Sequence, residues 1–242
     1  MSPQPSNSII GPLRRALRSA LEARRRPGRL LTALLIGLAL PGFAVPRLVH
    51  AQTADPQLEI WVHSSIVGIQ TAATAHPVVR LFDPAGRLRA QVEQGGAHTE
   101  KHWQVDLAAG RPVEQRIFIE PGDTVEVQIG AGITRLVAPA MAVTADTGAD
   151  TVSGKAPPGT LAVFVGLHRD LSLLDGPADL DPKSAQPAAD GRFSFSFGGV
   201  ADIGPGYWGE VAAVTRAGHI FIYPFAPPLV SLSTSENYAL IR

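Results

Sequence analysis

Short runs of alternating apolar and polar residues, each ended by turn-forming residues, are the feature that most constrains how this chain can fold. After residue 52, glycine and proline are frequent and apolar residues show no helical spacing. Residues 58–62 alternate strictly, with Leu58, Ile60 and Val62 on one face, and residues 124–129 follow the same pattern. Alternation with a period of two, bounded by turns, indicates short half-buried strands. The sequence therefore predicts an all-β fold.

Turn chemistry separates the predicted strands. Asp83-Pro-Ala-Gly86 lies between runs 78–82 and 87–92, which predicts a hairpin. Glu120-Pro-Gly-Asp123 links residues 117–119 to the strand at 124–129 and predicts a type II turn, in which glycine takes a positive φ angle at low cost. Further strands are expected at 133–137, 140–144, 161–165, 192–197, 210–215 and 219–223.

The two halves of this region share landmarks, which predicts an internal duplication. The segment ending at Gly68 corresponds to the segment ending at Gly154, an offset of 86 residues, and Pro121 corresponds to Pro205, an offset of 84. A repeat of one spacing predicts two domains of about 95 residues each, a common domain size. We expect them to occupy residues 52–146 and 147–242 and to meet at the polar segment 146–150.

The order of these signals resembles a known family. A strand ending in Val-x-Gly, a Val-x-Val strand, a hairpin such as that at Asp190-Gly191, and Pro-Gly-Asp before an alternating strand are similar to tandem immunoglobulin-like, carboxypeptidase-regulatory-like β-sandwich repeats of bacterial secreted and surface proteins. The resemblance covers most of residues 57–235. It implies two tandem Ig-like β-sandwich domains that serve as spacers, adhesive modules or accessories and share no catalytic residues. The second copy departs from Pro-Gly-Asp at Tyr207-Trp208.

Residues 1–51 have the order of a secretory signal. Seven arginines precede the apolar run 30–40, Pro41-Gly42 follows it, and Val49-His50-Ala51 supplies small residues before a cut. We expect Gln52 to be the mature N-terminus. The alternative is an uncleaved anchor, but a bilayer span needs about 20 apolar residues, and this run has 11. The sequence therefore predicts an extracellular or cell-surface protein that meets the membrane only through an uncleaved signal.

The charge of the chain limits the partners that we expect for it, and its cysteine content limits the chemistry that it can perform. Removing residues 1–51 takes away 8 of the 21 basic and 1 of the 21 acidic residues, which leaves 13 basic and 20 acidic residues, a net charge of −7. Nucleic acid and anionic membranes attract proteins with concentrated positive charge, so neither is an expected partner. The chain has no cysteine, so neither disulfides nor thiolate chemistry is available.

Two groups of residues were considered as metal sites. His98 and His102 would share a face in a helix, but in a strand they lie about 13 Å apart, too far for one ion. The segment Asp170–Asp181 contains four aspartates, a composition suited to calcium, in a spacing that matches no known binding loop. We expect a solvated strand face at the first group and a polar surface loop at the second, and we expect no cofactor or metal.

Aromatic residues form the remaining candidate for a ligand-binding surface. Trp61 and Trp103 lie in alternating runs and are expected to pack in the core. Tyr207 and Trp208 follow the turn Gly204-Pro-Gly206, with a strand expected only from Glu210, so Trp208 is expected to be exposed. Exposed rings cost apolar area unless something covers them. They either contact a ligand or cap their own sandwich.

Together these features predict a non-catalytic secreted or cell-surface binding or structural module, whose partner is an extracellular protein or a glycan. Two alternatives stay open. One is a carbohydrate-binding accessory protein, and the other is a small secreted metal-dependent hydrolase that uses the His98/His102 region.

Overall fold

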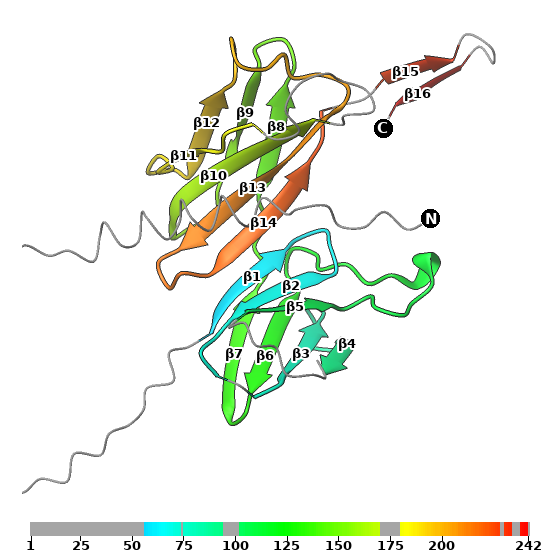
Figure 1. Cartoon of the computed structure of the whole chain (residues 1–242), viewed down its shortest axis with the longest axis vertical. Coiled ribbons are helices and arrows are strands. Elements are labelled where there is room, and N and C mark those ends of the chain that lie inside the picture. Colours follow the sequence, from blue (N-terminus) through cyan, green and yellow to red (C-terminus); the bar gives the residue numbers. More distant parts are fainter. Residues whose placement is uncertain are drawn as a thin grey trace, which may run out of the picture. The chain divides into compact units, whose positions relative to one another are not determined.

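The computed structural model describes residues 56–73, 75–93, 102–169, 180–227, 230–233 and 238–241 (Figure 1). Within these ranges the chain is built of strands, together with the single 3-10 turn η1 (Val113–Gln115). The expected signal segment, residues 1–51, lies outside the described residues. A search of the described residues for helices with the length and hydropathy of a membrane span found none.

The first sandwich consists of seven strands in two sheets. They are β1 (Gln57–Trp61), β2 (Ile66–Gln70), β3 (Pro77–Phe82), β4 (Leu88–Glu93), β5 (His102–Asp106), β6 (Thr124–Ile129) and β7 (Gly132–Val137). One sheet has the order β1-β2-β5 and the other β4-β3-β6-β7. Their facing side chains form one core cluster that includes Leu58, Leu81, Trp103 and Val127. This is an Ig-like arrangement of three strands against four.

The second sandwich repeats this arrangement. Its strands are β8 (Ala142–Asp146), β9 (Thr151–Lys155), β10 (Thr160–Arg169), β11 (Lys183–Ala185), β12 (Arg192–Ser196), β13 (Tyr207–Thr215) and β14 (Ile220–Phe225). The sheet orders are β8-β9-β12 and β11-β10-β13-β14, which are those of the first sandwich shifted by seven strands. A separate hairpin, β15 (Val230–Ser233) with β16 (Tyr238–Ile241), follows. The prediction of two tandem Ig-like β-sandwiches is confirmed.

The two sandwiches share a sheet. Strand β14 pairs in parallel with β1, with Ile60 opposite Phe221, so that β11-β10-β13-β14-β1-β2-β5 form one seven-stranded sheet. Phe221 and Tyr223 of β14 belong to the core cluster of the first sandwich. Met141 and Val143 pack against both clusters. The Tyr223 hydroxyl also donates a hydrogen bond to the carbonyl oxygen of Pro139, between β7 and β8.

Local patterns predicted the strands well. The alternating runs became β1 and β6, and the hairpin at 83–86 joins β3 to β4. Gly122 and Gly206, in the two equivalent turns, have φ angles of 95° and 91°, which a side chain would oppose. Residues 117–119 are not a strand, although Ile119 is buried and exchanges backbone hydrogen bonds with His63 and Ser64.

The expected equivalence of Gly68 and Gly154 is wrong by one residue. Val67 and Val152 both point into their cores, which gives an offset of 85. Gly68 then points outward, whereas Gly154 points inward, because a one-residue slip turns every side chain of a strand to the other face. The segment 146–150, where the sandwiches were expected to meet, is the last residue of β8 and the turn to β9, within the second sandwich.

Candidate functional site

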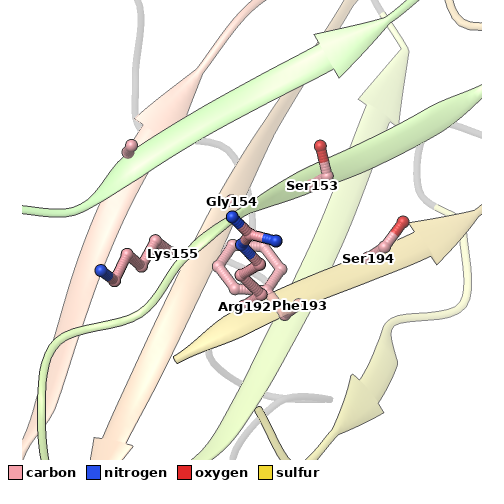
Figure 2. A pocket seen from close by; sticks show the side chains of 7 residues that line it. Ser153, Gly154, Lys155, Arg192, Phe193 and Ser194 are labelled. Carbon is pink, nitrogen blue, oxygen red and sulfur yellow. The ribbon is translucent and has the colours of Figure 1, made fainter. Parts of the chain in front are cut away.

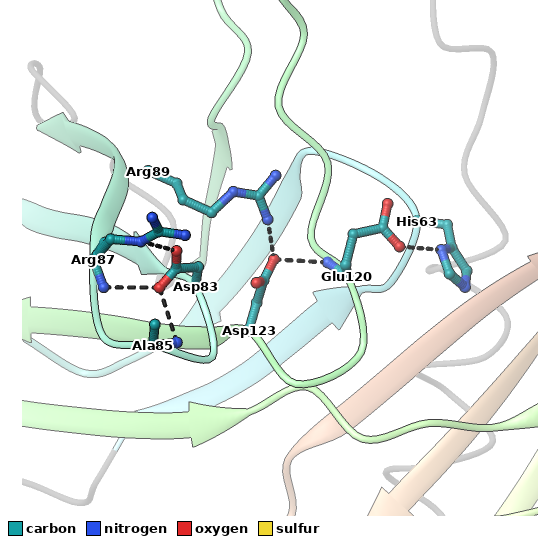
Figure 3. Close-up of polar contacts among 7 residues, drawn as sticks. All are labelled: His63, Asp83, Ala85, Arg87, Arg89, Glu120 and Asp123. Carbon is teal, nitrogen blue, oxygen red and sulfur yellow. Dashed lines mark hydrogen bonds and ion pairs between the residues drawn. The ribbon is translucent and has the colours of Figure 1, made fainter.

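In the first sandwich, the corner before β6 is closed by internal polar contacts (Figure 3). Asp123 is 1% exposed. Its carboxylate accepts hydrogen bonds from the Arg89 guanidinium and from the backbone N–H of Glu120. The Glu120 carboxylate lies 2.8 Å from Nδ1 of His63. These contacts tie together the β6 turn, β4 and the segment after β1, so this corner is a structural clamp.

The outer face of β4-β3-β6-β7 carries a row of paired charges. Glu126 is buried, and its two carboxylate oxygens lie 2.7 Å from Arg80 Nη1 and 2.6 Å from Arg135 Nε. Arg80 also donates through Nε to Gln91, at 2.9 Å. Hydrogen bonds from Arg80 and then Arg135 lower the pKa of Glu126 from its usual value. These contacts join four strands, and the two arginines share the one carboxylate.

The corresponding corner of the second sandwich contains the predicted aromatic pair. Strand β13 begins at Tyr207, three residues earlier than expected, so both rings lie on a strand with opposite orientations. Tyr207 is 8% exposed and packs in the second core cluster, which corrects its prediction as a surface contact. Its hydroxyl accepts a hydrogen bond of 2.9 Å from Arg169 Nε. Tyr207 is therefore a structural residue at this corner.

Trp208 is exposed, as predicted, at 44%. It lies opposite His168 of β10, and the two ring centroids are 4.0 Å apart with planes 25° from parallel. His168 is buried at 3% exposure, so one face of the indole rests on a fixed imidazole. Sequence reasoning missed His168 because the pairing depends on the β10–β13 register. A stacked indole is a rigid apolar surface whose ring does not need to be ordered on binding.

A shallow hollow of about 580 Å³ lies over β9 and β12 (Figure 2). It is lined by Ala142, Ser153, Gly154, Lys155, Arg192, Phe193 and Ser194. None of these residues was singled out from the sequence, because the cations are 37 residues apart and meet only through strand register.

The two groups of residues that were expected not to bind a metal are described only in part. His98 and residues 170–179 lie outside the described residues, so the expected loop and the His98/His102 pair stay predictions. His102 itself is half-buried on β5 opposite Gln70. Among the described residues, no three histidine or acidic side chains are grouped as metal ligands. Trp103 packs in the first core as expected, while Trp61 is half-buried and belongs to neither cluster.

No protein-family model and no curated protein matches this chain. Similar solved structures include the BSP domain of a biofilm associated protein, with 11% identity over 71% of this chain and 29% of that chain and a TM-score of 0.25. A tetra-tandem repeat from the extending region of a large adhesion protein has 16% identity over 76% of this chain and 54% of that chain, with a TM-score of 0.23. A 1.5-MDa bacterial ice-binding adhesin has 13% identity over 75% and 70%, with a TM-score of 0.23. TM-scores this low carry no argument about what this chain does.

Proposed function

We propose that this protein is a non-catalytic extracellular or cell-surface module that binds a glycan through Trp208. The observation that carries the proposal is the half-exposed indole of Trp208 stacked on the buried His168 ring. The fold around it supplies rigidity, because β13 is paired on both sides, by β10 and by β14. A side chain on a rigid central strand suits contact with one kind of ligand better than contact with many different partners.

The geometry favours a sugar over a flexible peptide. A flat indole face, with its other face already stacked, matches the apolar C–H face of a pyranose ring. The half-buried Glu210 lies two residues farther along β13 on the same face, where a carboxylate can accept hydrogen bonds from sugar hydroxyls. Because the indole is held in place before binding, little side-chain entropy is lost.

The extracellular location rests on the order of signals in residues 1–51 and on the acidic charge of residues 52–242. The shared sheet also supports a structural role, because two sandwiches joined by strand pairing and a shared core present the Trp208 face on a stiff pair of domains. The proposed protein is therefore a spacer that carries one ligand-binding surface, the face around Trp208.

The test compares Trp208→Ala with Phe118→Ala on an array of cell-surface polysaccharides. Phe118 is a matched control, because it is 42% exposed and lies in the first sandwich. We expect Trp208→Ala to lower glycan affinity at least tenfold while a cooperative melt shows that the protein stays folded, and Phe118→Ala to bind like the wild type. A drop of several degrees in Tm for Trp208→Ala, from about 1–3 kcal/mol of lost burial, with no glycan bound by the wild type, would make Trp208 a structural cap.

A further inference from the structure

The outer face of β8-β9-β12 carries two neighbouring cations. Arg192 of β12 lies directly opposite Lys155 of β9, and both side chains are exposed. Like charges directly opposite each other on one sheet face destabilise the pair. Arg192 Nε lies 3.3 Å from Asp190 Oδ2, but those side chains are 80% and 55% exposed, and an ion pair so open to water contributes little.

The next rows of the same face carry hydroxyl groups. Ser153 of β9 lies opposite Ser194 of β12, and beyond them Thr151 lies opposite Ser196. Figure 2 shows Ser153 and Ser194 on adjoining strands beside Lys155 and Arg192. Asp146, opposite Thr151 on β8, is the acidic group at the far end of the face. The face is therefore polarised, with positive charge at one end, hydroxyl groups along the middle and a carboxylate at the other end.

The first sandwich shows that the fold does not require this charge. With the offset of 85 residues, Lys155 corresponds to Gln70, and the partner of Gln70 is His102, where the second sandwich has Arg192. In the first sandwich the next row consists of Gly68 and Gln104. The same sheet thus forms without paired cations and without the serine pair.

Between these rows, Gly154 lies opposite Phe193, whose ring packs in the core on the other side of the sheet. A Cβ atom at Gly154 would lie 2.6 Å from Cζ of Phe193 and would collide with the carbonyl oxygen of Ala142, so the ring packs directly against the strand. Lys155 and Arg192 are exposed on the outer face, beside the shallow hollow.

We propose that this hollow is a second binding site, for an acidic glycan whose carboxylate or sulfate lies between Lys155 and Arg192 while the hydroxyls of its sugars contact Ser153 and Ser194. An anion removes the repulsion between the cations, and hydrogen bonds to charged groups are the stronger ones. The hollow lies on the β8-β9-β12 sheet, whereas Trp208 lies on β13 of the other sheet of this sandwich. Binding at the hollow can therefore be tested independently of the proposed glycan contact at Trp208.

The full chain is tested for binding to polygalacturonate, dextran sulfate and neutral dextran at physiological salt. We expect binding to at least one acidic polymer and none to dextran, and a loss of at least tenfold in Lys155→Gln/Arg192→Gln. The two acidic polymers decide between a carboxylate and a sulfate. Ser153→Ala/Ser194→Ala should weaken polymer binding without changing competition by inorganic sulfate, and Trp208→Ala should leave acidic-polymer binding unchanged.

The matched control is Arg111→Gln/Arg116→Gln, which removes two exposed cations from the first sandwich. Equal losses in both double variants would show a general charge attraction and overturn the proposal, as would wild-type protein that binds neither acidic polymer. Thermal melting checks folding. Removal of the like-charge pair should raise the Tm slightly or leave it unchanged, so a loss of binding cannot be ascribed to unfolding.

Discussion

The two sandwiches have the same strand order but different chemistry at the same corner. Asp123 follows Gly122 in the first, and Tyr207 follows Gly206 in the second, at the same step into β6 and β13. Asp123 is buried and bound by Arg89, whereas Tyr207 is buried and bound by Arg169. Each copy thus has a buried residue bound by an arginine here, a carboxylate in the first and a phenol in the second.

The next residue shows where the copies diverge. Thr124 lies opposite Phe82 in the first sandwich, and Trp208 lies opposite His168 in the second. Two residues farther along the same strands, the row Arg80, Glu126 and Arg135 corresponds to Gly166, Glu210 and Pro224. The first copy covers this face with ion pairs, and the second replaces both arginines and adds an exposed indole. The proposed glycan contact therefore lies on the face where the first copy has ion pairs.

The largest expected effect tests whether the two copies are one cooperative unit. Phe221 belongs to β14 but packs in the first core. Phe221→Ala should cost about 3–5 kcal/mol of unfolding free energy and should destabilise both sandwiches in one urea transition. Phe118→Ala, at an exposed position, should change the free energy little. Two separate transitions, with only the second sandwich affected, would show that the copies fold independently.

A smaller effect is expected in the charged row. Glu126→Gln leaves Arg80 and Arg135 without their shared carboxylate and should cost about 1–3 kcal/mol, the penalty for losing a charged hydrogen-bond partner at a buried position. Glu120→Gln should cost less, because the pair that Glu120 forms with His63 is open to water and contributes little. The two free energies of unfolding are measured side by side in urea. Equal losses would contradict a buried carboxylate at Glu126 that stabilises the first sandwich.

The same contrast predicts a pH dependence. The Arg80 and Arg135 hydrogen bonds lower the pKa of Glu126 below the usual 4.5. The stability that this carboxylate contributes is complete above that usual value and is lost as the pH falls through the lowered pKa. Chemical denaturation between neutral and acidic pH should show this loss in the wild type and a flatter dependence in Glu126→Gln. Identical curves for the two proteins would show that Glu126 is not the source of the pH dependence.

The joint between the copies gives a modest effect. Tyr223→Phe removes the hydroxyl that donates to Pro139 and should cost about 0.5–1.5 kcal/mol. Burial raises the pKa of the Tyr223 hydroxyl above its usual value of 10.0. Its contribution is therefore complete below pH 10 and falls as the pH rises toward the raised pKa. Tyr223→Phe should flatten the alkaline limb of the stability curve, and an unchanged limb would contradict a buried hydroxyl at the joint.

The sequence predicted what depends on local pattern. Strands such as β6 follow from a period of two and from the turn at Gly122, so their positions could be read within one or two residues. The pairing of β14 with β1 could not be predicted, because it joins strands about 160 residues apart and leaves no local signal. The exposure of Trp208 was predicted from the turn before it, whereas the burial of Tyr207 was missed because β13 begins three residues earlier than Glu210.

The cross-strand partners explain why the site was only half predicted. His168 and Trp208 lie 40 residues apart, as Lys155 and Arg192 lie 37 apart, and each pair exists only through one register. Register also explains why the predicted equivalence of Gly68 and Gly154 was wrong. Matching glycines in a sequence does not show which face of the sheet each glycine lies on.

The most direct test of the divergence between the copies places the residue of the first copy into the second, as Trp208→Thr, and measures retention on an immobilised glycan, with tryptophan fluorescence of the wild type as a second readout. Trp103 is buried and Trp61 is half-buried, so Trp208 is the indole most open to a ligand. We predict retention and a saturable shift in emission for the wild type, and no retention for Trp208→Thr, whose unfolding stays cooperative. Full glycan affinity in Trp208→Thr would contradict this prediction.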